Sequence, residues 1–310
     1  MTDKNDGDVF KFADLVDAAE KAAGDLQPWP NYYKLRAKEM EALFSLYGPA
    51  SRGRALDIGA GMAFNALMLD RLYDSTVASD LDAPDAHTHS LGMTAARSFL
   101  DKMPHKNIEL VSARCEGLPF EDGCFDTIYM IYTLEHIKDK EKALREALRV
   151  AKPGGEIIVI VPNFMERLLS PFSFYTGLFK KVFMAAFKRK GLQDDLPSPI
   201  DRRKESFAGR LANAYPHFPF PDPHGEYPDY FCELALTNSA YWRGLANSSG
   251  LKTKDVFTTM VFPKDFLSVF SGEKALEYYI RTLWLNKKFG KNRIIRHLGQ
   301  NLCLILKKDA

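Results

Sequence analysis

Short apolar segments alternate with helix-like segments through the first half of the chain. The segments with the length and apolar character of buried strands are residues 55–58, 76–79, 108–111, 125–131 and 155–163. Between them, apolar positions recur at helical spacing over residues 63–72, 91–100 and 140–150. This alternation predicts an α/β fold with a parallel sheet covered on both faces by helices, which binds its ligands beyond the carboxyl ends of the strands.

The rest of the chain divides around this alternating core. A short helix and a second helix over residues 31–48 precede it. The alternation stops after residue 163 and resumes with a helix over residues 237–250 and two strands, over residues 253–262 and 301–308. We therefore predict an N-terminal helical cap, the first part of the core, an α-rich aromatic and basic insertion, and the last core strands with a helical excursion at 263–299. These regions are residues 1–50, 51–163, 164–235 and 236–310.

The composition is that of an ordinary globular protein. Of the 310 residues 46% are hydrophobic, which suffices for a large core, and the formal net charge of +2 gives no reason to expect a nucleic-acid partner. The four cysteines lack the paired spacing of a disulfide framework or a zinc site. No apolar run approaches the roughly 20 residues that span a bilayer, and the acidic N-terminus lacks the apolar segment of a signal peptide. We therefore expect a cytoplasmic protein.

Two histidines in a polar segment resemble a metal-binding cluster. His87 and His89 lie close in the sequence to Asp82 and Asp85. A polar loop that follows a strand explains this composition better, so we expect no metal site in the protein.

A glycine-containing turn connects the first predicted strand to the next helix. Gly59 and Gly61 stand where backbone N–H groups and a helix N-terminus can approach a ligand. A dinucleotide site would place a third glycine at the position of Phe64, and a phosphate-binding loop would continue with Gly-Lys-Ser/Thr, which is absent. Asp80 ends the second predicted strand, where a carboxylate can accept hydrogen bonds from both hydroxyls of a ribose. The turn is therefore typical of a nucleoside site without a pyrophosphate.

Four sequence blocks occur together in this region. They are "ALDIGAGMAF", "VASDLD", "LVSARCEGLPFEDGCFDTIYMIYTLEHIKD" and "ALREALRVAKPGGEIIVIVPN". In content and order they resemble the class I S-adenosylmethionine-dependent methyltransferases, in particular the group that modifies small molecules and lipids. The resemblance implies a doubly wound, Rossmann-like sheet of seven mostly parallel strands. It also implies S-adenosyl-L-methionine as methyl donor and S-adenosyl-L-homocysteine as product.

The resemblance assigns a set of cofactor-binding residues. Those that would surround the methionine, ribose and adenine portions, or cover them from the N-terminal helix, are Asp57, Gly59, Gly61, Asp80, Leu81, Cys115, Glu116, Tyr33, Arg36 and Ile131. Arg36 would meet the cofactor's carboxylate. One position departs from the family, because Arg114 stands where members often carry an acid that receives the adenine amino group. Arginine has only donors, so Glu116 or a backbone carbonyl would accept that hydrogen bond instead.

Candidate catalytic residues come from two segments. The resemblance places Glu135 and His136 of "EHIKD" close to the sulfonium methyl group. Methyl transfer depends mainly on positioning, but a hydroxyl acceptor would benefit from a base such as His136; a purely structural histidine is the alternative. The proline-aromatic loop over residues 215–231 contributes His224 as a second candidate base. It also supplies three candidate substrate contacts, His217, Glu226 and Tyr227, although a stiff strap that packs on the core explains this loop equally well.

An amphipathic pattern marks residues 170–191 within the insertion. Its apolar positions follow helical spacing and are Tyr175, Leu178, Phe179, Val182, Phe183, Ala186 and Phe187. Basic residues accompany this stripe at Lys180, Lys181, Lys188, Arg189 and Lys190, and further ones lie nearby at Arg167, Arg202, Arg203, Lys204 and Arg210. The pattern is typical of a helix that lies on an anionic membrane surface, and equally of a lid that packs on the core. Residues 275–298 repeat the basic and aromatic composition.

The sequence thus favours methyl transfer from S-adenosylmethionine to an amphiphilic or lipid-linked acceptor. We expect O-methylation at the cytoplasmic face of the membrane, with peripheral contact through residues 170–191 and 275–298. A soluble natural-product or glycan methyltransferase and a non-catalytic nucleoside-binding module are the alternatives. The sequence indicates no nucleic-acid partner and does not define the oligomeric state.

Overall fold

The computed structural model describes residues 11–24, 31–83, 92–187, 220–261, 281–282 and 284–308, with only some side chains between residues 173 and 187. Three groups of predicted residues lie outside the described part of the chain. They are His217, the segment Asp85 to His89, and the basic and aromatic residues at positions 188–219 and 262–280. Among the described helices, none combines the length and the apolar character needed to cross a bilayer.

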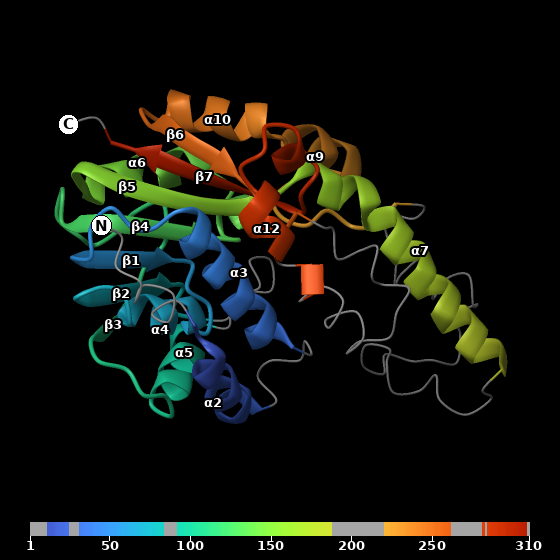
Figure 1. Cartoon of the computed structure of the whole chain (residues 1–310), viewed down its shortest axis with the longest axis horizontal. Helices are drawn as coiled ribbons and strands as arrows, with labels where there is room; N and C mark the ends of the chain where they lie inside the picture. The colour runs from blue at the N-terminus through green and yellow to red at the C-terminus, as the bar shows by residue number, and fades with distance from the viewer. Residues whose placement is uncertain are drawn as a thin grey trace.

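Seven strands form one sheet in the order β3-β2-β1-β4-β5-β7-β6 (Figure 1). Their bounds are β1 Arg54–Ile58, β2 Ser75–Asp80, β3 Ile108–Ser112, β4 Phe125–Ile131, β5 Ala151–Pro162, β6 Lys252–Phe257 and β7 Asn301–Lys307. The strands β1 to β5 pair in parallel, whereas β7 runs antiparallel to both β5 and β6. The predicted seven-stranded, mostly parallel sheet is therefore confirmed, and the chain order switches direction between β1 and β4.

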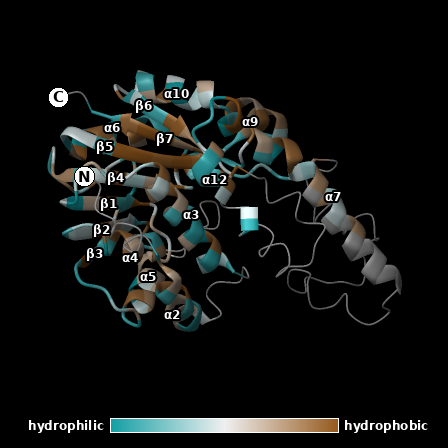
Figure 2. Cartoon of the chain, in the orientation of Figure 1, coloured by the Kyte–Doolittle hydropathy of each residue, from teal (hydrophilic) through white to brown (hydrophobic). Residues whose placement is uncertain are grey.

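Helices cover both faces of the sheet. The helical elements are α2 Ala13–Ala23, α3 Tyr32–Leu46, α4 Phe64–Asp70, α5 Gly92–Leu100, the 3₁₀ turn η2 Leu134–His136, α6 Lys140–Val150, α7 Phe164–Phe187, α9 Tyr230–Leu236, α10 Ser239–Ser248, α12 Trp284–Phe289 and the 3₁₀ turn η4 Ile295–His297. Successive residues of a strand face opposite sides, so Ile158 packs in the cluster under α2 to α5 and Ile157 in the cluster under α6 and α10. Figure 2 shows β5 and β7 as largely hydrophobic strands.

The helix of the insertion begins earlier in the chain than the amphipathic pattern over residues 170–191 predicts. Helix α7 starts at Phe164, directly after β5, and extends away from the sheet in Figure 1. Pro171 lies inside it and has no N–H for the carbonyl of Arg167. That carbonyl instead accepts hydrogen bonds from Ser170 Oγ and Tyr230 Oη, both at 2.8 Å. The proline is tolerated because these side-chain donors replace the missing backbone bond.

A short helix, α9, occupies the end of the segment that the sequence suggests is an extended loop. Its N-cap is Asp229, whose side chain accepts a hydrogen bond from the backbone N–H of Cys232 at 2.8 Å. The prediction that Arg167 belongs to an exposed basic surface is wrong. The Arg167 guanidinium is buried and lies 2.8 Å from the carboxylate of Glu233 on α9. Because a buried charge requires a partner, this arginine joins α7 to α9 rather than to an external anion.

The strand expected over residues 253–262 ends early, at Phe257. Beyond it, the backbone N–H of Thr258 donates to the carbonyl of Gly290 at 3.1 Å, and its hydroxyl donates to Asn301 Oδ1 at 2.9 Å. These bonds turn the chain out of the sheet and begin a polar network next to the carboxyl ends of the central strands.

Candidate active site

The two glycines of the turn after β1 differ in what a side chain at their position would meet. Both have positive φ angles, 72° for Gly59 and 53° for Gly61. A Cβ atom on Gly59 would lie 2.2 Å from Cγ2 of Thr133, whereas a Cβ atom on Gly61 would meet nothing within 4 Å. Gly59 is therefore required for packing against the segment after β4. Gly61 faces open space, so a ligand can approach its backbone closely.

Asp80 holds the turn in place from the end of β2. One carboxylate oxygen accepts a hydrogen bond from the N–H of Gly61 at 2.6 Å, and the other accepts one from the N–H of Leu81 at 2.7 Å. A carboxylate offers about four lone-pair positions, so each oxygen keeps capacity for a ribose hydroxyl. The residue predicted to bind the ribose thus also orders the glycine turn.

Asp57 lies buried at the end of β1. Burial, and after it the negative charge of Asp80, raise the pKa of Asp57 to about 8, while the backbone N–H of Ala66 opposes the shift. A positively charged ligand group at the turn would favour the ionised form. The α-ammonium of an amino-acid ligand is such a group.

The segment after β3 carries the residues that were predicted to contact the adenine ring. The backbone N–H of Ala113 donates to the carbonyl of Asp80 at 2.9 Å, which places this segment beside the turn. Cys115 and Glu116 are half-buried, and burial raises the pKa of the Cys115 thiol to about 12, so the thiol is neutral at physiological pH. The Arg114 side chain is exposed and its guanidinium lies 3.7 Å from Glu116. Leu81, also half-buried, lies next to Asp80 in the chain.

The two residues of α3 that were predicted to cover the cofactor both make contacts within the protein. The ring of Tyr33 packs between Phe64 and Phe99, with ring centroids 4.7 and 5.8 Å away. The Arg36 guanidinium lies 2.5 Å from Glu39 and 4.1 Å from the ring centroid of Tyr132. Arg36 is therefore ion-paired within the protein in this structure, and its predicted contact with a cofactor carboxylate stays a prediction.

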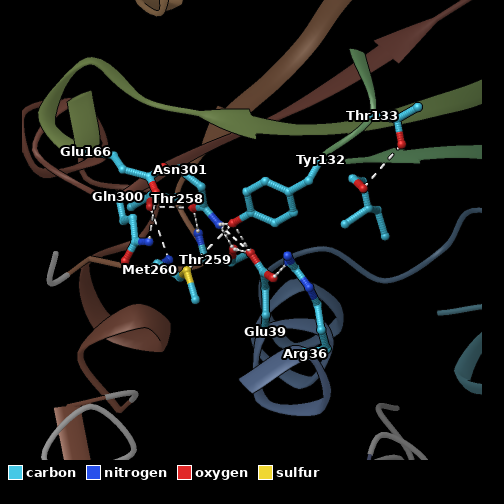
Figure 3. A network of polar contacts seen from close by, with 11 residues as sticks. Arg36, Glu39, Tyr132, Thr133, Glu166, Thr258, Thr259, Met260, Gln300 and Asn301 are labelled. Carbon is cyan, nitrogen blue, oxygen red and sulfur yellow. Dashed lines mark hydrogen bonds and ion pairs between the residues drawn. The ribbon is translucent and has the colours of Figure 1, made fainter. Parts of the chain in front are cut away.

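A buried polar network around Glu39 ties the N-terminal helix to the sheet (Figure 3). Glu39 Oε1 accepts hydrogen bonds from the hydroxyl of Tyr132 at 2.7 Å and from the amide of Asn301 at 2.5 Å. Tyr132 follows Ile131, the buried last residue of β4, and has a φ of 53°. The sequence contains no signal for this network, because a glutamate in a helix and an asparagine at the start of a strand are common on surfaces.

The three predicted catalytic residues lie together. Ligand atoms of Glu135, His136 and His224 are all within 4.8 Å of one another, and the two imidazole ring centroids are 5.0 Å apart. The Glu135 side chain is fully buried, and burial raises its pKa to about 8. The turn η2 that carries Glu135 and His136 directly follows Thr133, which packs against Gly59, so this cluster lies at the same edge of the sheet as the glycine turn.

The loop that supplies His224 also carries Glu226 and Tyr227. The Glu226 side chain is exposed, but its backbone N–H donates to the carbonyl of Glu135 at 2.9 Å. The Tyr227 ring is half-buried, with the ammonium group of Lys140 5.0 Å from its centroid. The predicted role of both residues as substrate contacts stays a prediction.

These residues fit S-adenosylmethionine. The open face of Gly61 admits a close ligand, Asp80 can accept from ribose hydroxyls, and Asp57 can balance the charge of an α-ammonium group. When bound, the cofactor supplies a methyl group on a positively charged sulfur. The residues named above would hold it beside the cluster of Glu135, His136 and His224.

Comparisons with known proteins agree with this fit. Residues 56–159 match the family model described as a methyltransferase domain. Among the curated relatives, a ubiquinone/menaquinone biosynthesis C-methyltransferase UbiE of Enterobacter sp. (strain 638) is 45% identical over 67 residues, which are 22% of this chain and 26% of the relative. The UbiE of Pseudomonas putida (strain GB-1) is 33% identical over 134 residues, 42% of this chain and 51% of the relative. Residues 56–159 are therefore similar to a methyltransferase domain, a class of domain whose methyl donor is S-adenosylmethionine.

The sequence similarity to the curated relatives covers only part of the chain. The matches span only about a quarter to a half of the relatives' own length, between 26% and 51% in the two cases above. Among solved structures, that of the cyclase SpnF covers 97% of this chain and 96% of its own, with a TM-score of 0.50 and 12% sequence identity. At this identity the likeness shows the fold alone, and a fold does not define a reaction.

Proposed function

We propose that this protein transfers a methyl group from S-adenosylmethionine to an oxygen atom of a lipophilic acceptor. The observation that carries the proposal is the position of two clusters at one edge of the sheet. The Gly59 to Gly61 turn with Asp80 binds the donor, and the cluster of Glu135, His136 and His224 receives the acceptor.

The acceptor cluster supports oxygen as the methylated atom. A hydroxyl acceptor must lose its proton as the new bond to the methyl carbon forms, and a neighbouring imidazole can accept that proton. His136 and His224 present imidazole nitrogens to the same space, and both rings are half-buried. The UbiE relatives are named as C-methyltransferases, but their similarity to this chain covers about half of their length or less. The atom methylated by those relatives is therefore not assigned to this chain.

The exposed face of α7 supports a lipophilic acceptor at a membrane surface. Four large apolar side chains recur along it with a spacing of three or four residues. Their exposed fractions are 44% for Leu168, 48% for Phe172, 43% for Tyr175 and 70% for Phe179. A contiguous apolar stripe on a helix that extends away from the sheet is suited to burial in the interfacial layer of a bilayer. The predicted basic residues further along this segment would attract anionic lipid.

The proposed reaction is tested by incubating the purified protein with methyl-labelled S-adenosylmethionine and either a lipid extract or a water-soluble extract. We expect labelled product in the lipid extract, with the label released by reagents that cleave methyl ethers or esters. Label in the soluble extract alone would favour the natural-product or glycan alternative. Donor binding by calorimetry without labelling in either extract would favour a non-catalytic nucleoside-binding module, and absence of donor binding would overturn the proposal.

The membrane contact is tested by flotation with vesicles of neutral lipid, with and without anionic lipid. We expect the protein to float with anionic vesicles and a variant with Phe172→Ser and Phe179→Ser to remain at the bottom. Phe231→Ser is the matched control, because Phe231 is 57% exposed on α9 and lies outside the stripe. A wild-type protein that fails to float with either vesicle would show that α7 does not bind membranes.

A further inference from the structure

Glu135, His136 and His224 form a cluster with the donor chemistry of a metal site. Each offers one ligand atom, a carboxylate oxygen or an imidazole nitrogen, and these atoms lie within 4.8 Å of one another. Two histidines and one carboxylate are a set that binds divalent transition metals while leaving coordination positions open. The sequence suggested no metal site, because His224 is far from the other two in the chain and lies in a loop rich in proline and aromatic residues.

The buried carboxylate of Glu135 provides a second observation that indicates a ligand. Its side chain is fully buried, and within the described residues neither oxygen accepts a hydrogen bond from another residue. A buried carboxylate without such partners is costly, and coordination of a cation is one of the few ways to compensate it. The Glu135 carboxylate therefore faces the two imidazoles with its lone pairs available.

The backbone holds the two segments of the cluster together. The N–H of Glu226 donates to the carbonyl of Glu135 at 2.9 Å, and the N–H of His224 donates to Glu233 Oε2 at 3.0 Å. Between these bonds Gly225 has a φ of 125°, and a Cβ atom there would lie 2.6 Å from the carbonyl oxygen of Glu135. The loop can approach η2 this closely only because residue 225 is glycine. Both histidines are thus presented by fixed backbone.

The charged groups around the cluster favour a cation at its centre. Glu166 and Glu226 add negative charge nearby. Of the neighbouring cations, the guanidinium of Arg36 is paired with Glu39, and the ammonium group of Lys140 donates to the carbonyl of Ile137 at 2.8 Å. Neither of these cations forms a salt bridge with Glu135 among the described residues.

We infer that Glu135, His136 and His224 bind a divalent transition metal ion of the Zn²⁺ type. Ligand bonds of about 2.1 Å in a tetrahedral site separate the ligand atoms by roughly 3.4 Å. The side chains must therefore close by up to about 1.4 Å from the separations in this structure, a movement that rotation of two half-buried imidazole rings can supply. Three protein ligands leave at least one position for an oxygen from outside the chain.

The inference deepens the proposed function and rests on it only for the identity of that outer oxygen. With the ion bound, the two imidazoles would act as ligands rather than as bases. An acceptor hydroxyl that bound the ion would then release its proton to solvent more readily, because the ion stabilises the oxyanion. The acceptor oxygen would then form its bond to the methyl carbon as the carbon–sulfur bond breaks, and S-adenosylhomocysteine would leave with the electron pair on sulfur. The substrate class would be phenols, enols or vicinal diols, whose oxygens ligate such ions.

The test measures metal binding by the full-length protein without any methyl donor. After treatment with a chelator and desalting, we expect calorimetry to show one Zn²⁺ bound per chain. His136→Ala and His224→Ala should each weaken binding by at least about tenfold, whereas His105→Ala, which removes an exposed histidine elsewhere, should leave it unchanged. Gly225→Ala keeps all three ligands but displaces the loop, and it should weaken binding as well.

Co²⁺ provides a spectroscopic readout of the same site. We expect absorption bands of a low-coordinate ion with nitrogen and oxygen ligands, without a thiolate charge-transfer band, and a shift of these bands when catechol is added as an oxygen ligand. No Zn²⁺ binding by the wild type, equal losses in His105→Ala and His136→Ala, or a thiolate band would each overturn the inference. Donor binding, measured separately with S-adenosylmethionine, tests the proposed function, so the two failures are distinguishable.

Discussion

Thr133 packs directly against Gly59, so closely that residue 59 has no room for a side chain. A Cβ atom there would lie 2.2 Å from Cγ2 and 2.4 Å from Oγ1 of Thr133. The Thr133 hydroxyl is itself fixed, because it donates to the carbonyl of Ile58 at 3.0 Å. This contact joins the turn after β1, the proposed donor site, to the segment that leads into η2 and the proposed acceptor cluster.

Substitution of the two glycines should therefore separate folding from donor binding. Gly59→Ala combines a left-handed backbone, which costs about 1–2 kcal/mol, with overpacking, which costs about 1–3 kcal/mol, so we expect a loss of roughly 2–5 kcal/mol in the free energy of unfolding. Gly61→Ala adds only the backbone cost, but its methyl group would occupy the open space of the turn. We expect it to fold and to lose affinity for S-adenosylmethionine.

Denaturant unfolding and calorimetry on both variants measure the two effects. In the Gly59→Ala background, Thr133→Ala should recover part of the lost stability, because it removes Cγ2 and Oγ1, the two closest of the three atoms that clash. Equal destabilisation by both glycine substitutions, or full donor affinity in Gly61→Ala, would contradict the assignment of roles.

Asp80 should be required for donor affinity as well as for the order of the turn. The two carboxylate oxygens of Asp80 accept hydrogen bonds from the backbone N–H groups of Gly61 and Leu81. In Asp80→Asn the side-chain NH2 group replaces one of these oxygens. An NH2 group cannot accept a hydrogen bond, so one of the two bonds is lost. A hydrogen bond to a charged group contributes about 1.5–3 kcal/mol, which corresponds to a loss of roughly 10- to 150-fold in affinity. Calorimetry with S-adenosylmethionine and with its demethylated product measures this loss. Asp82→Asn, at an exposed position two residues on, is the control and should bind normally.

The fold could be predicted from the sequence because alternation of buried strands and amphipathic helices is a local property. The strand Phe125–Ile131 and the helix Lys140–Val150 have the predicted bounds. The helix predicted over residues 237–250 forms as α10, whose N-cap Asn238 accepts a side-chain hydrogen bond from the N–H of Tyr241. Short-range patterns of this kind need no knowledge of distant contacts.

The features that the sequence did not predict depend on residues that are distant in the chain. Arg167 has the composition of a basic surface, and only the fold shows Glu233 beside it. Likewise, His136 and His224 could each be proposed as a base, but their proximity to Glu135 follows from the docking of the loop at Gly225. Local periodicity does not encode which distant residues pair in the fold, so a single sequence read alone does not define these contacts.

Asp57 should make the protein less stable as pH rises. Its folded pKa is raised to about 8 from the ordinary aspartate value of 3.8, so between these values the folded state holds a proton that the unfolded state has lost. The free energy of unfolding therefore falls with pH in this window, by about 1.4 kcal/mol per pH unit from this one group.

Asp57→Asn removes this dependence. Its stability relative to the wild type should increase from pH 5 to pH 7 with that slope, as measured by urea unfolding at each pH. Asp101→Asn replaces an exposed aspartate at the end of α5 and should follow the wild type. A constant difference between Asp57→Asn and the wild type across the range would show that the Asp57 carboxyl group ionises normally.

The ion pair between Arg167 and Glu233 should be strongly coupled. Its side chains are only 9% and 0% exposed, with the charged atoms 2.8 Å apart. Arg167→Met leaves a buried carboxylate without its cation, and removal of one partner of such a pair costs about 3–5 kcal/mol. Glu233→Gln keeps an acceptor for the N–H of His224 but loses the charge. In the double variant no unpaired charge remains, so it should be more stable than Arg167→Met alone.

A double-mutant cycle by denaturant unfolding measures this coupling against an exposed pair of the same types. Arg145 and Glu141 lie one turn apart on α6 with a separation of 3.1 Å and side chains 51% and 45% exposed, and such pairs are coupled by about 0.3–0.5 kcal/mol. We expect the buried cycle to give a coupling several times larger. Because Arg167 holds Glu233, and Glu233 in turn accepts from the N–H of His224, Arg167→Met should also weaken Zn²⁺ binding although none of the three proposed ligands is changed. Equal coupling in the two cycles would mean that α7 and α9 are held together by apolar packing, and that the position of His224 does not depend on this ion pair.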